Sequence, residues 1–172
     1  MCRIINFKAL LIMFEIKKYS TMDTIDKKIL TILQGNAKLG TKEIANQIGL
    51  SITPTYERIK KMESTGLIEK YVAILNGSAI EKNITVFCQI SLSHHKKELI
   101  EKFKEAIVIL PEVMGCFHVA GNSDFLLKVV VEDMNAFQQF AIEKLTSFEG
   151  VSNIQSSFVI EEIKNDTAYN LV

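Results

Sequence analysis

A cluster of hydroxyl-bearing, aromatic and basic side chains between positions 51 and 61 has the chemistry needed to bind nucleic acid. Guanidinium and ammonium groups pair with phosphates, whereas polar side chains can read the edges of bases. The predicted contact residues are Ser51, Thr53, Tyr56, Arg58, Lys60 and Lys61. On its own, this cluster is equally typical of an amphipathic helix with a solvated charged face, so its meaning depends on the elements around it.

The surrounding residues predict three helices that would position the cluster. Asp23 is placed to cap the first helix, with Asp26 at the third helical position, in a variant of the capping box. Thr41 is the predicted cap of the second helix, Gly49 the left-handed residue just after it, and Ser51 the cap of the third. Helical spacing assigns these side chains to the inward faces: Ile25, Ile29, Ile32, Leu33, Ile44, Ala45, Ile48, Ile52, Thr55, Ile59 and Met62.

The order of these helices indicates a helix-turn-helix. In that motif a short helix, a tight turn and a second helix place the last helix in the major groove of DNA. Gly66-Leu67-Ile68 follows the third helix and predicts an exit toward a strand, as in a winged helix-turn-helix. The ordered set therefore favours DNA binding over a merely solvated helix.

The second half of the chain alternates strand and helix patterns in the order βαββαβ. This order is typical of a ferredoxin-like unit, so the predicted fold class is α+β, with a winged helix-turn-helix preceding that unit. Both helices would cover one face of the sheet, which leaves a partly apolar face that needs a partner such as a second copy. The predicted strands cover residues 84–92, 113–121, 124–132 and 151–163, and the helices run over 96–110 and from Asp133 to a stop at Gly150.

Several of these motifs together resemble the Lrp/AsnC family of leucine-responsive and asparagine-operon regulators. The resemblance runs from Met22 to about Lys164 and rests on Asp23-x-x-Asp26, Ile44 through Leu50, Ser51-x-x-Pro54-x-x-Glu57-Arg58-Ile59-Lys60-Lys61-Met62-Glu63 and Gly66-Leu67-Ile68. It implies a homodimer that pairs its C-terminal sheets, often stacked into an octamer. A symmetric dimer would set two recognition helices on successive major grooves of double-stranded DNA.

The resemblance also implies a small-molecule site, usually for an amino acid, at the turn between the second and third strands. The family's Gly-x-x-Asp mark is present here, and Ala120 stands where the family often has a hydroxyl. Backbone amides would meet the ligand's carboxylate, and Asp124 its ammonium group. The alternative is an ordinary hairpin turn. The predicted effector residues are Gly121, Asn122, Ser123 and Asp124, with Ser156 of the last strand lining the same region.

Charge distribution supports a two-part organisation. The 172 residues carry no net charge, but residues 22–75 have a net charge of +2 and residues 76–172 a net charge of −5. A basic front joined to an acidic back suits a DNA reader attached to a domain that avoids DNA. The predicted parts are an extension over 1–21, explained by a mis-chosen start or by an extra element, a winged helix-turn-helix over 22–75, a linker over 76–83, a ferredoxin-like effector and oligomerisation domain over 84–164, and a tail over 165–172.

Other functions find little support in the sequence. Cys116 and His118 share a strand face but lack a third group to orient a nucleophile, so no enzyme is predicted. The histidines and cysteines do not indicate a metal or a cofactor. Cysteines without CxxC spacing fit a reducing cytoplasm, and a DNA-binding protein is expected there at the nucleoid. The apolar run from Ala9 to Phe14 is too short to span a membrane. The rival function is an amino-acid-binding or assembly protein whose helical head binds protein instead of DNA.

Overall fold

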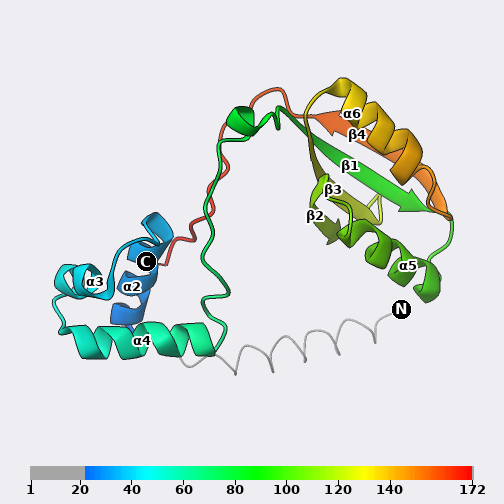
Figure 1. Ribbon diagram of the computed structural model, residues 1–172. Helices are drawn as coiled ribbons and strands as arrows, with labels where there is room; N and C mark the ends of the chain where they lie inside the picture. The colour runs from blue at the N-terminus through cyan, green and yellow to red at the C-terminus, as the bar shows by residue number, and fades with distance from the viewer. Residues whose placement is uncertain (1–21, 172) are drawn as a thin grey trace. The chain divides into compact units, whose positions relative to one another are not determined.

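The computed structural model describes residues 22–171, and the expectations for the extension over 1–21 lie outside the described residues (Figure 1). The chain forms two compact units. One contains the described residues up to Ala73 together with the tail from Asn165, and the other spans Ile74–Lys164. The tail, which the sequence leaves as a separate segment, therefore belongs to the helical unit. The side-chain amide of Gln34 holds it there, accepting a bond from the Tyr169 amide at 2.7 Å and donating one to the Tyr169 carbonyl at 3.1 Å.

Three helices build the first unit: α2 (Thr24–Gly35), α3 (Thr41–Ile48) and α4 (Ile52–Ser64). Their buried apolar side chains form one cluster, as the helical spacing predicts. Burial of one such side chain contributes about 1.5–3 kcal/mol. Ile52, in the first turn of α4, is an exception. Its side chain is 51% exposed and lies outside this cluster. The cluster comprises Ile29, Leu33, Ile44, Ile59 and Met62.

The helix ends confirm most of the predicted caps and correct one. The Asp23 carboxylate accepts from the Asp26 amide at 2.8 Å, which confirms the capping box. Gly49 adopts the expected left-handed conformation with φ at 73°. The prediction that Thr41 caps α3 is wrong, because Gly40 occupies that position and the Glu43 carboxylate reaches back to the Gly40 amide at 2.8 Å.

Two further differences concern the ends of α4. Ser51 occupies the N-cap position, but its hydroxyl makes no capping bond. After α4, the expected strand is absent from the described chain, since residues 69–76 adopt neither helix nor strand. A strand needs a partner for its backbone groups, and this segment pairs with no strand among residues 22–171. A short 3-10 turn, η1 (Gly77–Ile80), lies near the start of the second unit and precedes its first strand.

The second unit confirms the ferredoxin-like prediction. Its four strands pair antiparallel in the order β2-β3-β1-β4, with β1 and β3 at the centre. The last helix continues into a π-helical turn and stops before Gly150, and the last strand ends earlier than predicted, at Phe158. The elements are β1 (Ile84–Leu92), α5 (Lys97–Val108), β2 (Val113–His118), β3 (Phe125–Val131), α6 (Met134–Gln139), η2 (Phe140–Leu145) and β4 (Val151–Phe158).

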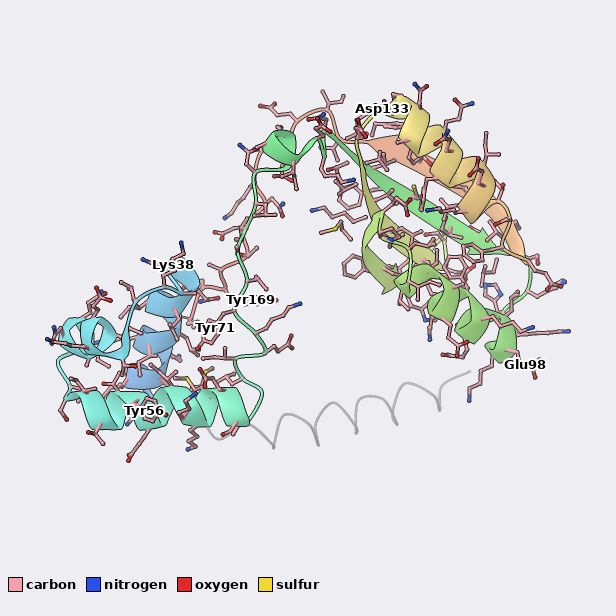
Figure 2. The ribbon with its side chains drawn as sticks, in the orientation of Figure 1. Lys38, Tyr56, Tyr71, Glu98, Asp133 and Tyr169 are labelled. Atoms are coloured by element: carbon pink, nitrogen blue, oxygen red, sulfur yellow. The ribbon has the colours of Figure 1, made fainter. Side chains whose placement is uncertain are left out.

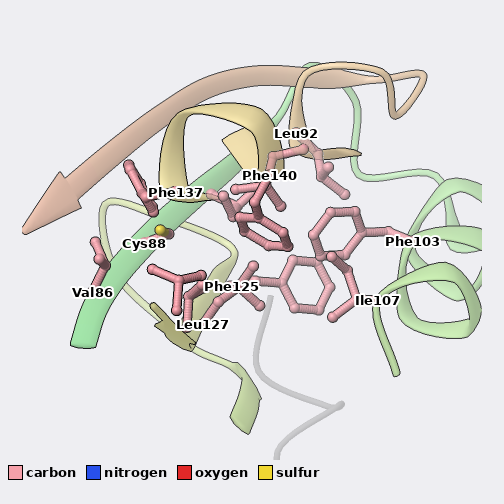
Figure 3. Packing of buried hydrophobic residues seen from close by; sticks show 13 residues of the cluster. Val86, Cys88, Leu92, Phe103, Ile107, Phe125, Leu127, Phe137 and Phe140 are labelled. Atoms are coloured by element: carbon pink, nitrogen blue, oxygen red, sulfur yellow. The ribbon is translucent and has the colours of Figure 1, made fainter. Parts of the chain in front are cut away.

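One face of this sheet is buried and the other is open. Alternate residues of β1 and β3 pack against aromatic and aliphatic side chains from both helices, with the rings of Phe103 and Phe125 centred 4.7 Å apart (Figure 3). Because side chains alternate along a strand, the intervening residues lie on the opposite face. The strand register assigns to that face the apolar Phe87, Phe117, Leu126 and Val130, and on β4 the polar Asn153, Gln155 and Ser157.

Asp133 offers a test of how α6 is fixed over the sheet (Figure 2). Its carboxylate accepts a hydrogen bond from the Ala136 amide at 2.8 Å. We expect Asp133→Ala to lower the stability of α6 against opening by about 0.5–2 kcal/mol, because the first-turn amide loses its partner. Native-state hydrogen exchange of the α6 amides measures this change. Asp133→Asn retains the acceptor and should behave like the unaltered protein; equal damage from both variants would contradict this role.

Candidate DNA-binding and effector sites

The exposed side of α4 gathers most of the predicted DNA-binding residues. Thr53, Tyr56, Lys60 and Lys61 are exposed, as is Ser51 at the helix entrance. Tyr56 is 50% exposed and projects from the outer side of α4 (Figure 2). The helix is held from behind by its buried residues Thr55, Ile59 and Met62. The arrangement presents hydroxyl, aromatic and ammonium groups to solvent along one helix, which is what a recognition helix requires.

Arg58 differs from the rest of this set because it is bound to two carboxylates. Its Nη1 lies 2.7 Å from Asp23 Oδ2 and 2.6 Å from Asp26 Oδ1, and the side chain is only partly exposed. The hydrogen bonds to Asp26 and then Asp23 raise the pKa of Arg58. The Asp26 amide and then Arg58 lower the pKa of the Asp23 carboxyl. The guanidinium thus ties α4 to the N-terminus of α2, a pairing across more than thirty residues that no local pattern signals.

Lys60 and Lys61 have different surroundings. The Lys60 ammonium lies 2.7 Å from the Glu63 carboxylate and 5.8 Å from the centre of the Tyr56 ring. The Tyr71 hydroxyl donates to the other Glu63 oxygen at 3.0 Å. Glu63 is a site neighbour that the i,i+3 spacing from Lys60 could have indicated. The Lys61 ammonium has no polar partner among residues 22–171, so it is available to a phosphate.

The turn with the predicted effector residues joins β2 to β3. Gly121 has φ at 149°, a region that favours glycine, and its position is open, with no atom where a side chain would begin. Gly121 and Asn122 are exposed, whereas Ser123 is half-buried. The turn closes through a bond from the Val119 amide to the Asp124 carbonyl at 2.9 Å. Backbone and side chains of the turn therefore remain accessible at its tip and are anchored at its base.

Asp124 provides that anchor through its carboxylate. Oδ2 accepts from the Leu92 amide at 2.7 Å, and Oδ1 lies 2.7 Å from His95 Nε2. The Asp124 amide also donates to the Ile90 carbonyl at 2.9 Å. Both carboxylate oxygens thus have partners, and the side chain is only 16% exposed. This contact could not be predicted from the sequence, since nothing in the spacing of positions 95 and 124 indicates it.

Ser156 does not join the turn within the chain. It pairs with Cys88 of β1, and its Oγ lies 3.6 Å from the Cys88 Sγ on the helix-covered side of the sheet. The turn instead meets β1 at Ile90 and Leu92. The structure therefore brings Gly121, Asn122, Ser123 and Asp124 together and leaves Ser156 apart from them.

Cys116 and His118 face the helix-covered side, since they pair with Leu127 and Phe125. The His118 ring stacks on Phe125 with centroids 4.8 Å apart, and burial raises the pKa of the Cys116 thiol. A raised pKa disfavours the reactive thiolate. No group of three or more metal-ligating acids, histidines and cysteines occurs among residues 22–171. In the same range, no helix has the length and apolar character needed to cross a bilayer.

A helical head with an exposed recognition helix, followed by a sheet domain with an accessible turn, defines a DNA-binding transcription regulator with a ligand-binding domain. Residues 22–69 match the family model for winged helix-turn-helix DNA-binding domains, and residues 85–169 match that for the Lrp/AsnC ligand binding domain. The chain belongs to the Lrp/AsnC family. Members of this family are transcription regulators and not enzymes.

Individual relatives agree over nearly their whole length. The Bkd operon transcriptional regulator of Pseudomonas aeruginosa is 36% identical over 142 residues, which cover 83% of this chain and 93% of that protein. The leucine-responsive regulatory protein of Rhizobium meliloti is 35% identical over 144 residues, with coverage of 84% and 92%. A crystal structure of a Neisseria meningitidis transcriptional regulator in complex with L-Met has a TM-score of 0.84 at 36% identity, covering 88% of this chain and 97% of that one.

The two kinds of basic residue on α4 should respond differently to salt. Each phosphate contact contributes about 0.9 to the slope of log affinity against log salt concentration. Lys61→Ala should flatten that slope, because a phosphate partner is lost. Arg58→Ala should weaken DNA binding and leave the slope unchanged if its guanidinium, which is paired with Asp23 and Asp26, serves to position α4 instead of binding phosphate. Fluorescence anisotropy titrations of duplex DNA at several salt concentrations measure both quantities.

Asp26→Ala separates the two roles of Arg58 without removing a cation. If Arg58 positions α4, this variant should also weaken DNA binding, since Arg58 then keeps only one of its two ion pairs with the start of α2, that with Asp23. If Arg58 binds phosphate directly, the guanidinium, now held by Asp23 alone, should strengthen binding instead. A strengthened Asp26→Ala complex, or an Arg58→Ala slope as flat as that of Lys61→Ala, would contradict the positioning role.

Proposed function

We propose that α4 enters the major groove of double-stranded DNA and reads sequence there. The observation that carries this proposal is the exposed side of α4, where an aromatic ring and two lysines stand together and the Lys61 ammonium is without a partner among the described residues. Thr53 and Tyr56 lie near base edges, and Ser51, Lys60 and Lys61 near phosphates. Arg58 supports these residues indirectly, because its ion pairs with Asp23 and Asp26 hold α4 against α2. The protein acts in the cytoplasm, at the nucleoid.

The open sheet face supports assembly into a homodimer. A second copy covers the apolar side chains that the register places there, and dimers stack further into an octamer. The need is physical, because an apolar patch on a sheet with only one covered face is costly to leave in water. Two copies also double the positive footprint and set two recognition helices at one helical turn of DNA.

A small amino acid is the proposed effector, bound where the β2–β3 turn of one dimer meets a neighbouring dimer. The exposed amides of Gly121, Asn122 and Ser123 meet its carboxylate, and Asp124 meets its ammonium. The L-Met complex of the Neisseria meningitidis relative supports the amino-acid class. Ser156 makes no contribution within the same chain, because it lies on the other side of β1 from the turn.

A second candidate function has one observation in its favour. Ile52 and Tyr56 are four residues apart on α4 and are both about half exposed, at 51% and 50%. Residues at this spacing share a helix face, so the pair forms a small apolar surface of the kind that binds protein. Under this alternative the head binds a protein and duplex DNA is not its ligand. Lys61→Ala should weaken the binding of duplex DNA, and Ile52→Ala should leave it unchanged. This pair of results would favour DNA over a protein as the ligand of the helical head.

The dimer proposal predicts the effect of one charge on the open face. Phe117 is 55% exposed on β2, so Phe117→Glu introduces a carboxylate into the proposed interface. We expect the variant to lose its dimer at micromolar concentration, because the buried charge would have no partner. Met134→Glu is the matched control, since Met134 is 53% exposed on α6 away from that face. Multi-angle light scattering of the full chain gives the masses; a dimeric Phe117→Glu protein would contradict the interface.

The effector proposal predicts a loss of affinity when the Asp124 charge is removed. Asp124→Asn keeps an oxygen for the Leu92 amide but leaves the ligand ammonium without its counter-charge. A lost charged hydrogen bond costs about 1.5–3 kcal/mol, which corresponds to roughly ten- to a hundredfold in affinity. Calorimetry with each common L-amino acid tests this, with Glu132→Gln as a control on an exposed carboxylate at the opposite end of β3. Should no amino acid bind, or should Asp124→Asn bind equally well, the turn has only a structural role.

A further inference from the structure

His95 contacts the carboxylate of Asp124, the group to which the ammonium of the proposed effector would bind. The Asp124 carboxylate has one oxygen held by a backbone amide, that of Leu92 at 2.7 Å. A backbone amide at the end of β1 cannot leave without breaking the strand. The other oxygen, Oδ1, is held by the imidazole of His95 at 2.7 Å. A ligand cation that approaches Asp124 therefore meets the one oxygen whose partner is a side chain.

The imidazole can leave this position at little structural cost. His95 is 72% exposed, against 16% for Asp124, so rotation of its side chain uncovers no core. It lies in residues 93–96, between β1 and α5, which form neither helix nor strand. Asp124 in contrast stays in place, because its own amide donates to the Ile90 carbonyl and its Oδ2 keeps the Leu92 amide. The pair thus joins a fixed acceptor to a mobile donor.

We propose that His95 is a built-in competitor of the effector: it closes Asp124 in the free protein and is displaced by the ligand's ammonium group. This inference rests on the proposed amino-acid site and adds the residue that regulates its affinity. The apparent affinity of a site that is open only part of the time is reduced by the open fraction. His95 therefore raises the concentration of amino acid that is needed to occupy the site.

The same displacement gives the ligand a structural consequence. While His95 is bound, the β2–β3 turn is connected by side chains to the segment that leads into α5. Displacement removes this connection, while the turn keeps its hydrogen bonds to Ile90 and Leu92 of β1. A ligand changes an equilibrium only by its different affinity for two states, and the closed and open forms of Asp124 are two such states.

The test compares His95→Ala with His94→Ala in the full-length chain. The neighbouring His94 has no polar partner among the described residues, so it controls for loss of an exposed imidazole. L-methionine is the first calorimetric probe, followed by the other common L-amino acids. The side-chain contact that covers Asp124 Oδ1 is a weak one, because His95 is largely exposed, so His95→Ala should bind the amino acid about 1.4- to fivefold more tightly. His94→Ala should bind it like the unaltered protein. Melting temperatures verify that both variants fold.

A second measurement follows the unaltered protein directly. Adding the amino acid should move the imidazole NMR signals of His95 toward those of a solvent-exposed ring, with those of His94 unchanged. N-acetyl-L-methionine has no ammonium group and should leave the His95 signals in place. These shifts report displacement even where a change in affinity is small.

The outcomes distinguish this inference from the function on which it rests. Weaker or unchanged binding by His95→Ala, with Asp124→Asn still impaired, overturns the competitor role and leaves the amino-acid site standing. Weaker binding would make His95 a ligand contact. If neither the unaltered protein nor His95→Ala binds any amino acid, both the site and the competitor are overturned. Binding that appears only in His95→Ala supports the proposal.

Discussion

One-sided burial of the four-stranded sheet is the constraint on which the second unit depends. Alternate residues of β1 and β3 lie under α5 and α6, and a shift of one residue would move them all to water. The register is therefore fixed, and so is the composition of the opposite face. The same pairing brings the start of β3 against the end of β1, where the Leu92 amide meets Asp124. Core packing, open face and turn geometry thus have a common cause.

The helical unit uses charge as well as burial to place its functional face. The buried side of α4 fixes the rotation of the helix, and Arg58 ties the middle of α4 to the capping carboxylates of α2. The Asp23 carboxylate therefore has two roles, since it pairs with Arg58 and also accepts a hydrogen bond from the Asp26 amide. Because this ion pair is partly exposed, it contributes more to the placement of α4 than to the overall stability.

Local patterns predicted most of the fold but few of the site's long-range contacts. The limits of β1, the Asp133 cap and the left-handed Gly49 follow from side-chain periodicity and backbone sterics within a few residues. The Thr41 prediction failed because α3 already begins at Thr41, with Gly40 at the N-cap and the Gly40 amide bonded to the Glu43 carboxylate. The partners of Arg58 and Asp124 were missed because each is about thirty residues distant, and single-sequence spacing carries no information on such pairs.

The connection between the units bears on how an effector could act on DNA binding. Residues 69–76 have neither helix nor strand in the chain, so they lack the rigid element that would transmit a local displacement at the β2–β3 turn. The turn does, however, continue into β2 and β3, which also carry Phe117, Leu126 and Val130 of the open face. A ligand at the turn is therefore closer in structure to the assembly surface than to the linker. We infer that the effector changes how copies pair, and that the spacing of the recognition helices follows from that pairing.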